Sequence, residues 1–164
     1  MARDDDLVGR MASCWREMRR GPATAIVRDR LFGAGEDAID PVQVDVLDLL
    51  VFRDGWRMNE LASALSVDPS TVTRTLQRME AAGLAVRTPH DHDGRVVTVH
   101  ITPAGRLCQE TVMVRRRGIV GEIFAGLDAD DQERLVELVE RFIALAYTYV
   151  GLTQTFGSPT AAAG

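Results

Sequence analysis

Residues 67–84, VDPSTVTRTLQRMEAAGL, predict a short amphipathic helix with its own start and stop signals. Asp68-Pro69 favours a helix start, because aspartate is a good N-cap and proline is tolerated at the first helical position. Gly83 suits the left-handed residue that ends many helices. Val72, Leu76 and Met79 share one side at about 100° per residue. We expect that side to be buried.

The opposite side of this helix is polar and basic and holds no acid. Hydroxyl, amide and guanidinium groups are those that contact phosphates and base edges in a DNA groove. A helix N-terminus also favours a phosphate, through its free N–H groups. A plain solvated face is the alternative. The candidate DNA contacts are Ser70, Thr71, Thr73, Arg74, Gln77 and Arg78.

A second short helix, capped by Asn59, precedes this segment, and a β-hairpin follows it. Strands are expected at residues 84–87 and 96–101, with a loop over 89–94. Two short helices closed by a hairpin are typical of a winged helix-turn-helix. Arg95 then lies where a wing meets a minor groove or the DNA backbone. Arg87, on the first strand, either supports the wing or contacts phosphate.

Longer helices are expected on both sides of this unit. Apolar spacing indicates a helix over 7–20, and a second apolar set follows over 25–32 after the Gly21-Pro22 break. Asp40-Pro41 starts another helix that runs to about residue 53 and buries Val42. Thr102-Pro103 starts a long helix to about residue 126, and Asp128 caps the last one. The sequence therefore predicts a mainly α fold with a small β-hairpin wing.

Composition is that of an ordinary globular protein: 164 residues, 46% hydrophobic and 26% charged. The net charge of −5 argues against a general polyanion binder. However, residues 55–106 hold six arginines and five acids, so the centre is mildly basic and the ends are acidic. The start lacks the pattern of a signal peptide, and the apolar stretch 142–152 is about half the ~20 residues of a spanning helix. We expect a soluble, cytoplasmic protein with no membrane contact.

Nothing in the sequence indicates catalysis or a cofactor. There is no Ser-His-Asp order, no glycine-rich phosphate loop and no metal signature. Two distant cysteines suggest neither a disulfide framework nor a zinc site. The stretch His90-Asp91-His92-Asp93 has metal-ligand residue types, but without a spaced partner cluster it is interpreted as a solvated turn. The expected protein is not an enzyme.

Several fragments in this order resemble the multiple-antibiotic-resistance regulator (MarR) family. They are Met58-Asn59-Glu60-Leu61-Ala62, residues 67–74, residues 79–84, Asp93-Gly94-Arg95 and residues 101–106. The resemblance implies a homodimeric transcriptional regulator, with one winged helix per half-site of a pseudo-palindromic operator. It makes residues 69–82 the recognition helix and Arg95 the wing-tip arginine. Many members carry a second basic residue where this chain has Gly94, so we expect a weaker or more pH-sensitive wing contact.

The resemblance also implies how the chain is divided. Residues 1–39 form an N-terminal helical dimerisation segment, and residues 40–106 form the winged helix-turn-helix DNA-binding domain. Residues 107–156 form the C-terminal dimerisation helices, and residues 157–164 are a low-complexity tail expected to be disordered.

Two kinds of signal are considered for release of the DNA. A small-molecule effector would enter a pocket that Met11, Trp15 and Met18 line, although a Met/Trp stripe is more often plain core. An oxidant would act on Cys14, which lies near the reactive thiol of the hydroperoxide-sensing branch. That branch supplies tyrosines, and this chain has only Tyr147 and Tyr149.

The function expected is therefore a sequence-specific repressor that binds its operator as a homodimer and is released by a small ligand. The alternatives are a thiol-based oxidant sensor acting through Cys14, and a winged-helix interaction module that has lost operator binding.

Overall fold

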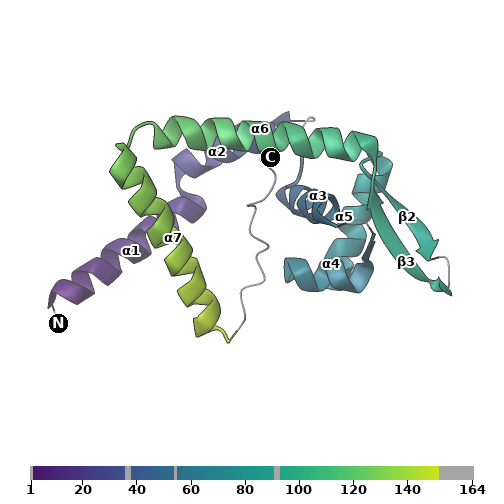
Figure 1. The fold of residues 1–164 in the computed structure, drawn as a ribbon, viewed down its shortest axis with the longest axis horizontal. Coiled ribbons are helices and arrows are strands. Elements are labelled where there is room, and N and C mark those ends of the chain that lie inside the picture. The colour runs from purple at the N-terminus through teal and green to yellow at the C-terminus, as the bar shows by residue number, and fades with distance from the viewer. Residues whose placement is uncertain (1, 36–37, 54, 91–92, 152–164) are drawn as a thin grey trace. The chain divides into compact units, whose positions relative to one another are not determined.

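The structure is a computed structural model that describes residues 2–35, 38–53, 55–90 and 93–151. It divides into two compact units, residues 1–119 and 120–164. Within the described ranges there are seven helices and a small antiparallel sheet, and the three helices over residues 41–81 form a winged helix-turn-helix with the sheet (Figure 1). In chain order the elements are α1 (Ala2–Arg20), α2 (Pro22–Phe32), α3 (Pro41–Phe52), β1 (Trp56–Arg57), α4 (Met58–Leu65), α5 (Pro69–Ala81), β2 (Ala85–His90), β3 (Asp93–Ile101), α6 (Pro103–Phe124) and α7 (Ala129–Tyr149).

The sheet has the order β1-β3-β2, and all its pairs are antiparallel. In the hairpin, Ala85 pairs with Ile101 and Pro89 with Val97, and the register shifts between Pro89 and His90. Both hairpin strands extend further toward the turn than the sequence predicts, because cross-strand pairing continues beyond the apolar alternation. The two-residue strand β1, which pairs with β3 at Val99, was not predicted.

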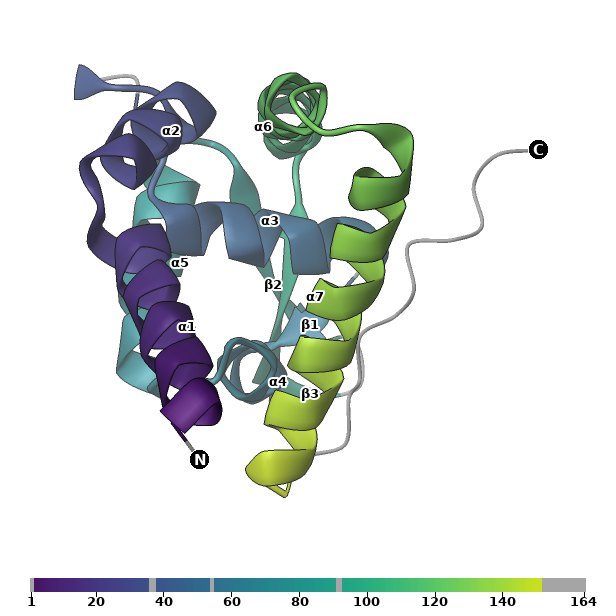
Figure 2. The same ribbon diagram turned by 90° about the vertical axis from the view of Figure 1, so that its left-hand side faces the viewer.

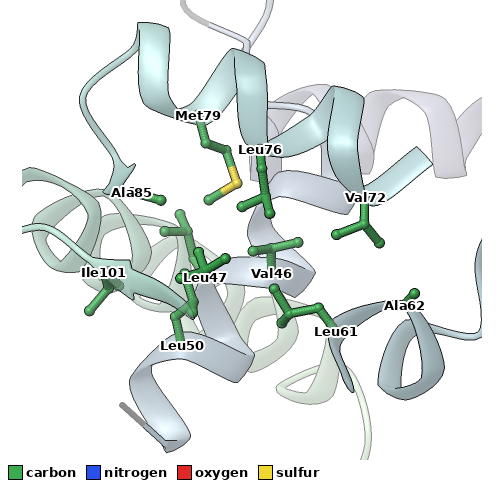
Figure 3. Packing of buried hydrophobic residues seen from close by; sticks show 11 residues of the cluster. Val46, Leu47, Leu50, Leu61, Ala62, Val72, Leu76, Met79, Ala85 and Ile101 are labelled. Atoms are coloured by element: carbon green, nitrogen blue, oxygen red, sulfur yellow. The ribbon is translucent and has the colours of Figure 1, made fainter. Parts of the chain in front are cut away.

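The core of the winged helix lies between α3, α4, α5 and the sheet. Val72, Leu76 and Met79 are fully buried, which confirms the predicted inner side of α5. Figure 3 shows Leu76 and Met79 pointing from α5 toward α3, which carries Val46 and Leu47, whereas Val72 points toward α4. Each fully buried aliphatic side chain stabilises the fold by about 1.5–3 kcal/mol. Burial of this side fixes which side of α5 faces outward.

Helix ends agree with the sequence at some positions and differ at others. Asp40 caps α3, since its carboxylate accepts the Val42 N–H at 2.8 Å. Val42 itself is only half-buried, because it lies in the exposed first turn of α3, and Val44 is buried instead. The predicted cap at Asn59 is wrong: the N-cap of α4 is Arg57, two residues earlier, and the helix begins at Met58.

The two ends of α5 compare differently with the prediction: the end at Gly83 agrees, and the start at Asp68 differs in one respect. Asp68 is the N-cap of α5, but its side chain forms no capping hydrogen bond, and Pro69 takes the first helical position. Gly83 has φ +70°, the left-handed conformation that was predicted to end this helix.

The first turn of α6 packs tightly against the end of α5. The Thr102 hydroxyl donates to the Gly83 carbonyl at 2.6 Å, and the Thr102 N–H donates to the Leu84 carbonyl at 3.1 Å. A Cβ atom at Gly105 would lie 2.1 Å from the Leu84 carbonyl oxygen, so only glycine fits there. Further along α6, Gln109 and Arg116 both donate to the Asp48 carboxylate of α3, at 2.8 and 3.3 Å. The long helix is therefore attached to the winged helix at two places.

The helices outside the winged unit leave much apolar surface uncovered. Figures 1 and 2 show α1 and α2 as consecutive helices separated by a short break. The described side chains of α1 are all exposed, and so are most of those of α7, none of which is buried. Among the described residues, none of the helices is long and apolar enough to cross a membrane. The predicted disordered tail, residues 157–164, lies outside the described residues.

Candidate DNA interface

The outer side of α5 presents the predicted groove-contacting residues to solvent. Ser70, Arg74, Gln77 and Arg78 are exposed, while Thr71 is half-buried. They project from a helix whose other side is anchored in the core, so their spacing is set by a rigid element rather than a loop. This side of α5 therefore combines exposure, donors and positive charge.

The side chains at the centre of this surface are available for a partner. Within the described part of the chain, Arg74 and Gln77 form no side-chain hydrogen bond or ion pair. Arg78 lies 3.8 Å from the Asp40 carboxylate, and both side chains are largely exposed. An exposed pair of this kind contributes about 0–1 kcal/mol. A phosphate can therefore replace Asp40 as the partner of Arg78 at little cost.

Thr73 is less suited to the predicted role. It is half-buried, and its hydroxyl donates to the Pro69 carbonyl one turn earlier at 2.9 Å. That bond uses the only proton that the hydroxyl can donate to a phosphate. Thr73 can still accept a hydrogen bond from a base amino group.

Arg87 lies on β2, and its guanidinium is held by Glu80 of α5. Its Nε donates to Glu80 Oε1 at 2.8 Å, and its terminal nitrogen donates to Oε2. The Arg87 side-chain hydrogen bond and charge hold the pKa of the Glu80 carboxyl below its usual value, and the Glu80 carboxylate raises the pKa of Arg87. Of the two predicted roles for Arg87, this geometry favours support of the wing.

Sequence reasoning did not identify Glu80 as part of this interface. The sequence did contain a signal for this pair: an acid in the last turn of the predicted helix and an arginine on the strand that follows the glycine turn. Arg95 lies in β3, but its side chain, like those of the other residues near the hairpin tip, is outside the described part of the structure. The predicted wing-tip contact and the effect of Gly94 remain predictions.

The predicted ligand-binding residues do not surround a cavity. Met11, Trp15 and Met18 are exposed on α1. A cavity of about 330 Å³ lies instead between the α2–α3 connection and α6, and none of these three residues lines it. Its lining residues are Phe32, Ile39, Ala104, Leu107, Cys108, Thr111, Val112 and Arg115. The sequence did not predict that residues of α6 line a cavity, because their position depends on how α6 packs against α3.

The two cysteines have different surroundings. Cys14, the predicted redox residue, is exposed on α1, whereas Cys108 is half-buried beside the α6 cavity. Burial raises the pKa of the Cys108 thiol, and the charge of Arg115 opposes that shift only in part. Cys108 is therefore the less reactive type of thiol. Among the described residues there is no group of three or more acidic, cysteine or histidine side chains that could hold a metal ion.

Comparisons with known proteins agree with this geometry. Residues 39–96 match the model of the MarR family. The chain is 26% identical over 113 residues to the HTH-type transcriptional repressor MdtR of Bacillus subtilis, which covers 69% of this chain and 73% of that protein. It is 32% identical over 85 residues to the multiple antibiotic resistance protein MarR of Salmonella typhimurium, which covers 51% of this chain and 59% of that relative.

The fold is shared more widely than the sequence. A solved structure described as a MarR family transcription regulator matches with a TM-score of 0.76 at 20% identity, over 92% of this chain and 95% of that one. The matched family model covers α3 to the first part of β3, which includes most of the core and the outer side of α5. The matched segment, residues 39–96, therefore carries a winged helix-turn-helix of the MarR family, and over this part the chain is similar to DNA-binding transcriptional regulators.

Proposed function

We propose that the protein is a repressor that binds a pseudo-palindromic operator as a homodimer, one winged helix in each half-site. The observation that carries this proposal is the outer side of α5, where Arg74 and Gln77 are exposed and have no partner among the described residues. Arginine binds guanine and glutamine binds adenine through paired hydrogen bonds in the major groove. MdtR, one of the relatives, is named as a repressor, which favours repression over activation.

The apolar surface of α1 and α7 supports the homodimer. Met18 on α1 and Leu138 and Leu145 on α7 are each more than half exposed, as are other large apolar residues of both helices. Exposed apolar stripes on amphipathic helices favour burial against a second chain. A dimer would present two α5 helices about one turn of DNA apart, ~34 Å, as a two-fold symmetric operator requires.

The cavity beside α6 supports release by a small ligand. It lies where the α2–α3 connection meets the helix that is attached to the end of α5, so an occupant would touch segments that position the winged helix. Its lining is mainly apolar, with Arg115 as its charged group. Exposed Cys14 supports the oxidant alternative. A regulator of this kind works in the cytoplasm, where the DNA is.

The test is binding of the purified protein to its own promoter DNA, followed by anisotropy across a salt series and against scrambled DNA. Selective binding with a steep salt dependence is expected. Arg74→Ala should weaken operator binding roughly 5- to 150-fold, the value of one paired base contact. Arg30→Ala, which removes the same charge from an exposed position on α2, is the matched control. Equal operator binding by wild type, Arg74→Ala and Arg30→Ala would refute the assignment of α5 as the helix that binds the operator.

The same assay separates the other parts of the proposal. Arg95→Ala should weaken binding to operator DNA and to scrambled DNA by a similar factor. It should also make the salt dependence of binding shallower, since a phosphate contact is lost. Light scattering at the same protein concentration tests the dimer, and a monomer in the DNA-bound state would contradict it. The oxidant alternative is tested by treating wild type and Cys14→Ser with diamide and measuring release of the operator DNA. Release that persists in the variant would exclude Cys14 as the sensor.

A further inference from the structure

One carboxylate receives every hydrogen bond that Arg87 forms toward α5. Glu80 accepts from the Arg87 Nε at 2.8 Å, from its terminal nitrogen, and from its backbone N–H at 3.2 Å. Both side chains are half-buried, with exposed fractions of 26% for Glu80 and 33% for Arg87. The strand β2 lies at the edge of the sheet, so its outer side depends on partners outside the sheet. Glu80 provides that partner at Arg87.

The pair spans the corner between the two parts of the proposed DNA interface. Glu80 lies in the last turn of α5, the chain turns at Gly83, and Arg87 is the third residue of β2. A guanidinium that binds a carboxylate with two parallel hydrogen bonds has a defined orientation as well as a favourable energy. Because the backbone N–H of Arg87 joins the same carboxylate, the strand itself is oriented relative to the helix.

We propose that Glu80 and Arg87 are positioning residues that fix the angle of the wing relative to α5. Arg87 then serves operator binding without touching DNA. The proposal rests on the proposed function, because it requires α5 and the wing to bind one duplex together. Its physical basis is preorganisation: a wing held at one angle loses less conformational freedom when both parts bind.

The competing interpretation is that Arg87 leaves Glu80 and contacts a phosphate. The two interpretations predict opposite signs for Glu80→Ala. Removal of this acid makes the interface more positive and releases Arg87, so a phosphate contact would strengthen binding and steepen the salt slope by about one. Loss of a positioning pair would weaken binding in spite of the added positive charge. Only geometry accounts for a loss in that direction.

The experiment measures operator binding by full-length wild type, Glu80→Ala and the matched control Glu110→Ala. Glu110 is exposed on α6, and its replacement changes the net charge by the same amount. We expect Glu80→Ala to bind at least fivefold more weakly than Glu110→Ala, with an unchanged salt slope. Binding equal to or tighter than that of Glu110→Ala would overturn the proposal. Arg74→Ala in the same series shows whether α5 binds the operator at all, so failure of the proposed function is recognised separately.

Two further measurements keep the test decisive. The exchanged pair Glu80→Arg/Arg87→Glu restores an ion pair at the corner, and it should recover most of the lost affinity. If Arg87 contacted a phosphate instead, the exchanged pair would not recover affinity, because residue 87 would then be acidic. Hydrogen exchange without DNA provides a readout independent of binding: amides of residues 85–88 should exchange at least fivefold faster in Glu80→Ala, with residues 70–78 unchanged. Equal exchange throughout would also overturn the proposal.

Discussion

Replacement of Gly105 with alanine tests whether the first turn of α6 packs so closely against the end of α5 that no side chain fits between them. The added Cβ atom would lie 2.1 Å from the Leu84 carbonyl oxygen and 2.9 Å from Cγ1 of Ile101. Ordinary contacts begin at 3.4 Å, so the first distance is more than 1 Å too short. A flexible side chain could move away at little cost, but the Leu84 carbonyl already accepts the Thr102 N–H. The helix itself must therefore shift.

The expected loss follows from two opposing effects. Forced overpacking of a well-packed contact costs about 1–3 kcal/mol, and the upper part of this range applies because the obstacle is backbone. Alanine in place of glycine in a helix returns at most about 1 kcal/mol. The net loss in the free energy of unfolding is then about 2 kcal/mol. For a chain of this size, it lowers the melting temperature by roughly 4–8 °C.

The assay is thermal unfolding followed by circular dichroism, at one protein concentration because the melting temperature of the proposed dimer would depend on concentration. Gly118→Ala is the control: it lies in the same helix, and nothing in the described structure lies within 4 Å of its added Cβ. It should keep or raise the melting temperature. The reasoning would be refuted if Gly105→Ala melted at or above the temperature of Gly118→Ala.

Four further outcomes are expected. Leu76→Ala removes a fully buried side chain and should lower the free energy of unfolding in urea by about 2–5 kcal/mol; a loss under about 1 kcal/mol would contradict the described core. Asp128→Ala removes the carboxylate that caps α7 and should cost about 0.5–2 kcal/mol, seen as faster amide exchange in the first turn of α7. Asp48→Ala leaves Gln109 and Arg116 without their shared acceptor and should cost about 1 kcal/mol, since the site is half-exposed. The depressed pKa of Glu80 stabilises the folded state fully above its unfolded value near 4.5, and this contribution is lost as pH falls through the folded pKa; Glu80→Ala should therefore show a weaker decline in stability on acidification than wild type.

The α5 segment shows what could be predicted from sequence alone. Its proline start, its glycine end and its two sides depend on capping, backbone conformation and a 3.6-residue period, all of which act within a few residues. Those signals located the buried side with Leu76 and the exposed side with Arg74, and the structure has both where they were expected. The cap of α4 was placed at Asn59, two residues after the observed N-cap Arg57, because helix ends are the least sharply determined part of a helix.

The contacts between distant segments were decided only by the tertiary structure. Asp48 meets Arg116 across 68 positions, and Gly105 meets Leu84 only because α6 returns over the end of α5. Glu80 and Arg87 are seven residues apart, yet their pairing depends on how the wing folds back on the helix. Sequence by itself determined the course of α5 and its outward side, because these follow from local chemistry. Which cations stay available for DNA and which are held by carboxylates depends on packing, since a salt bridge needs its two partners brought within 4 Å.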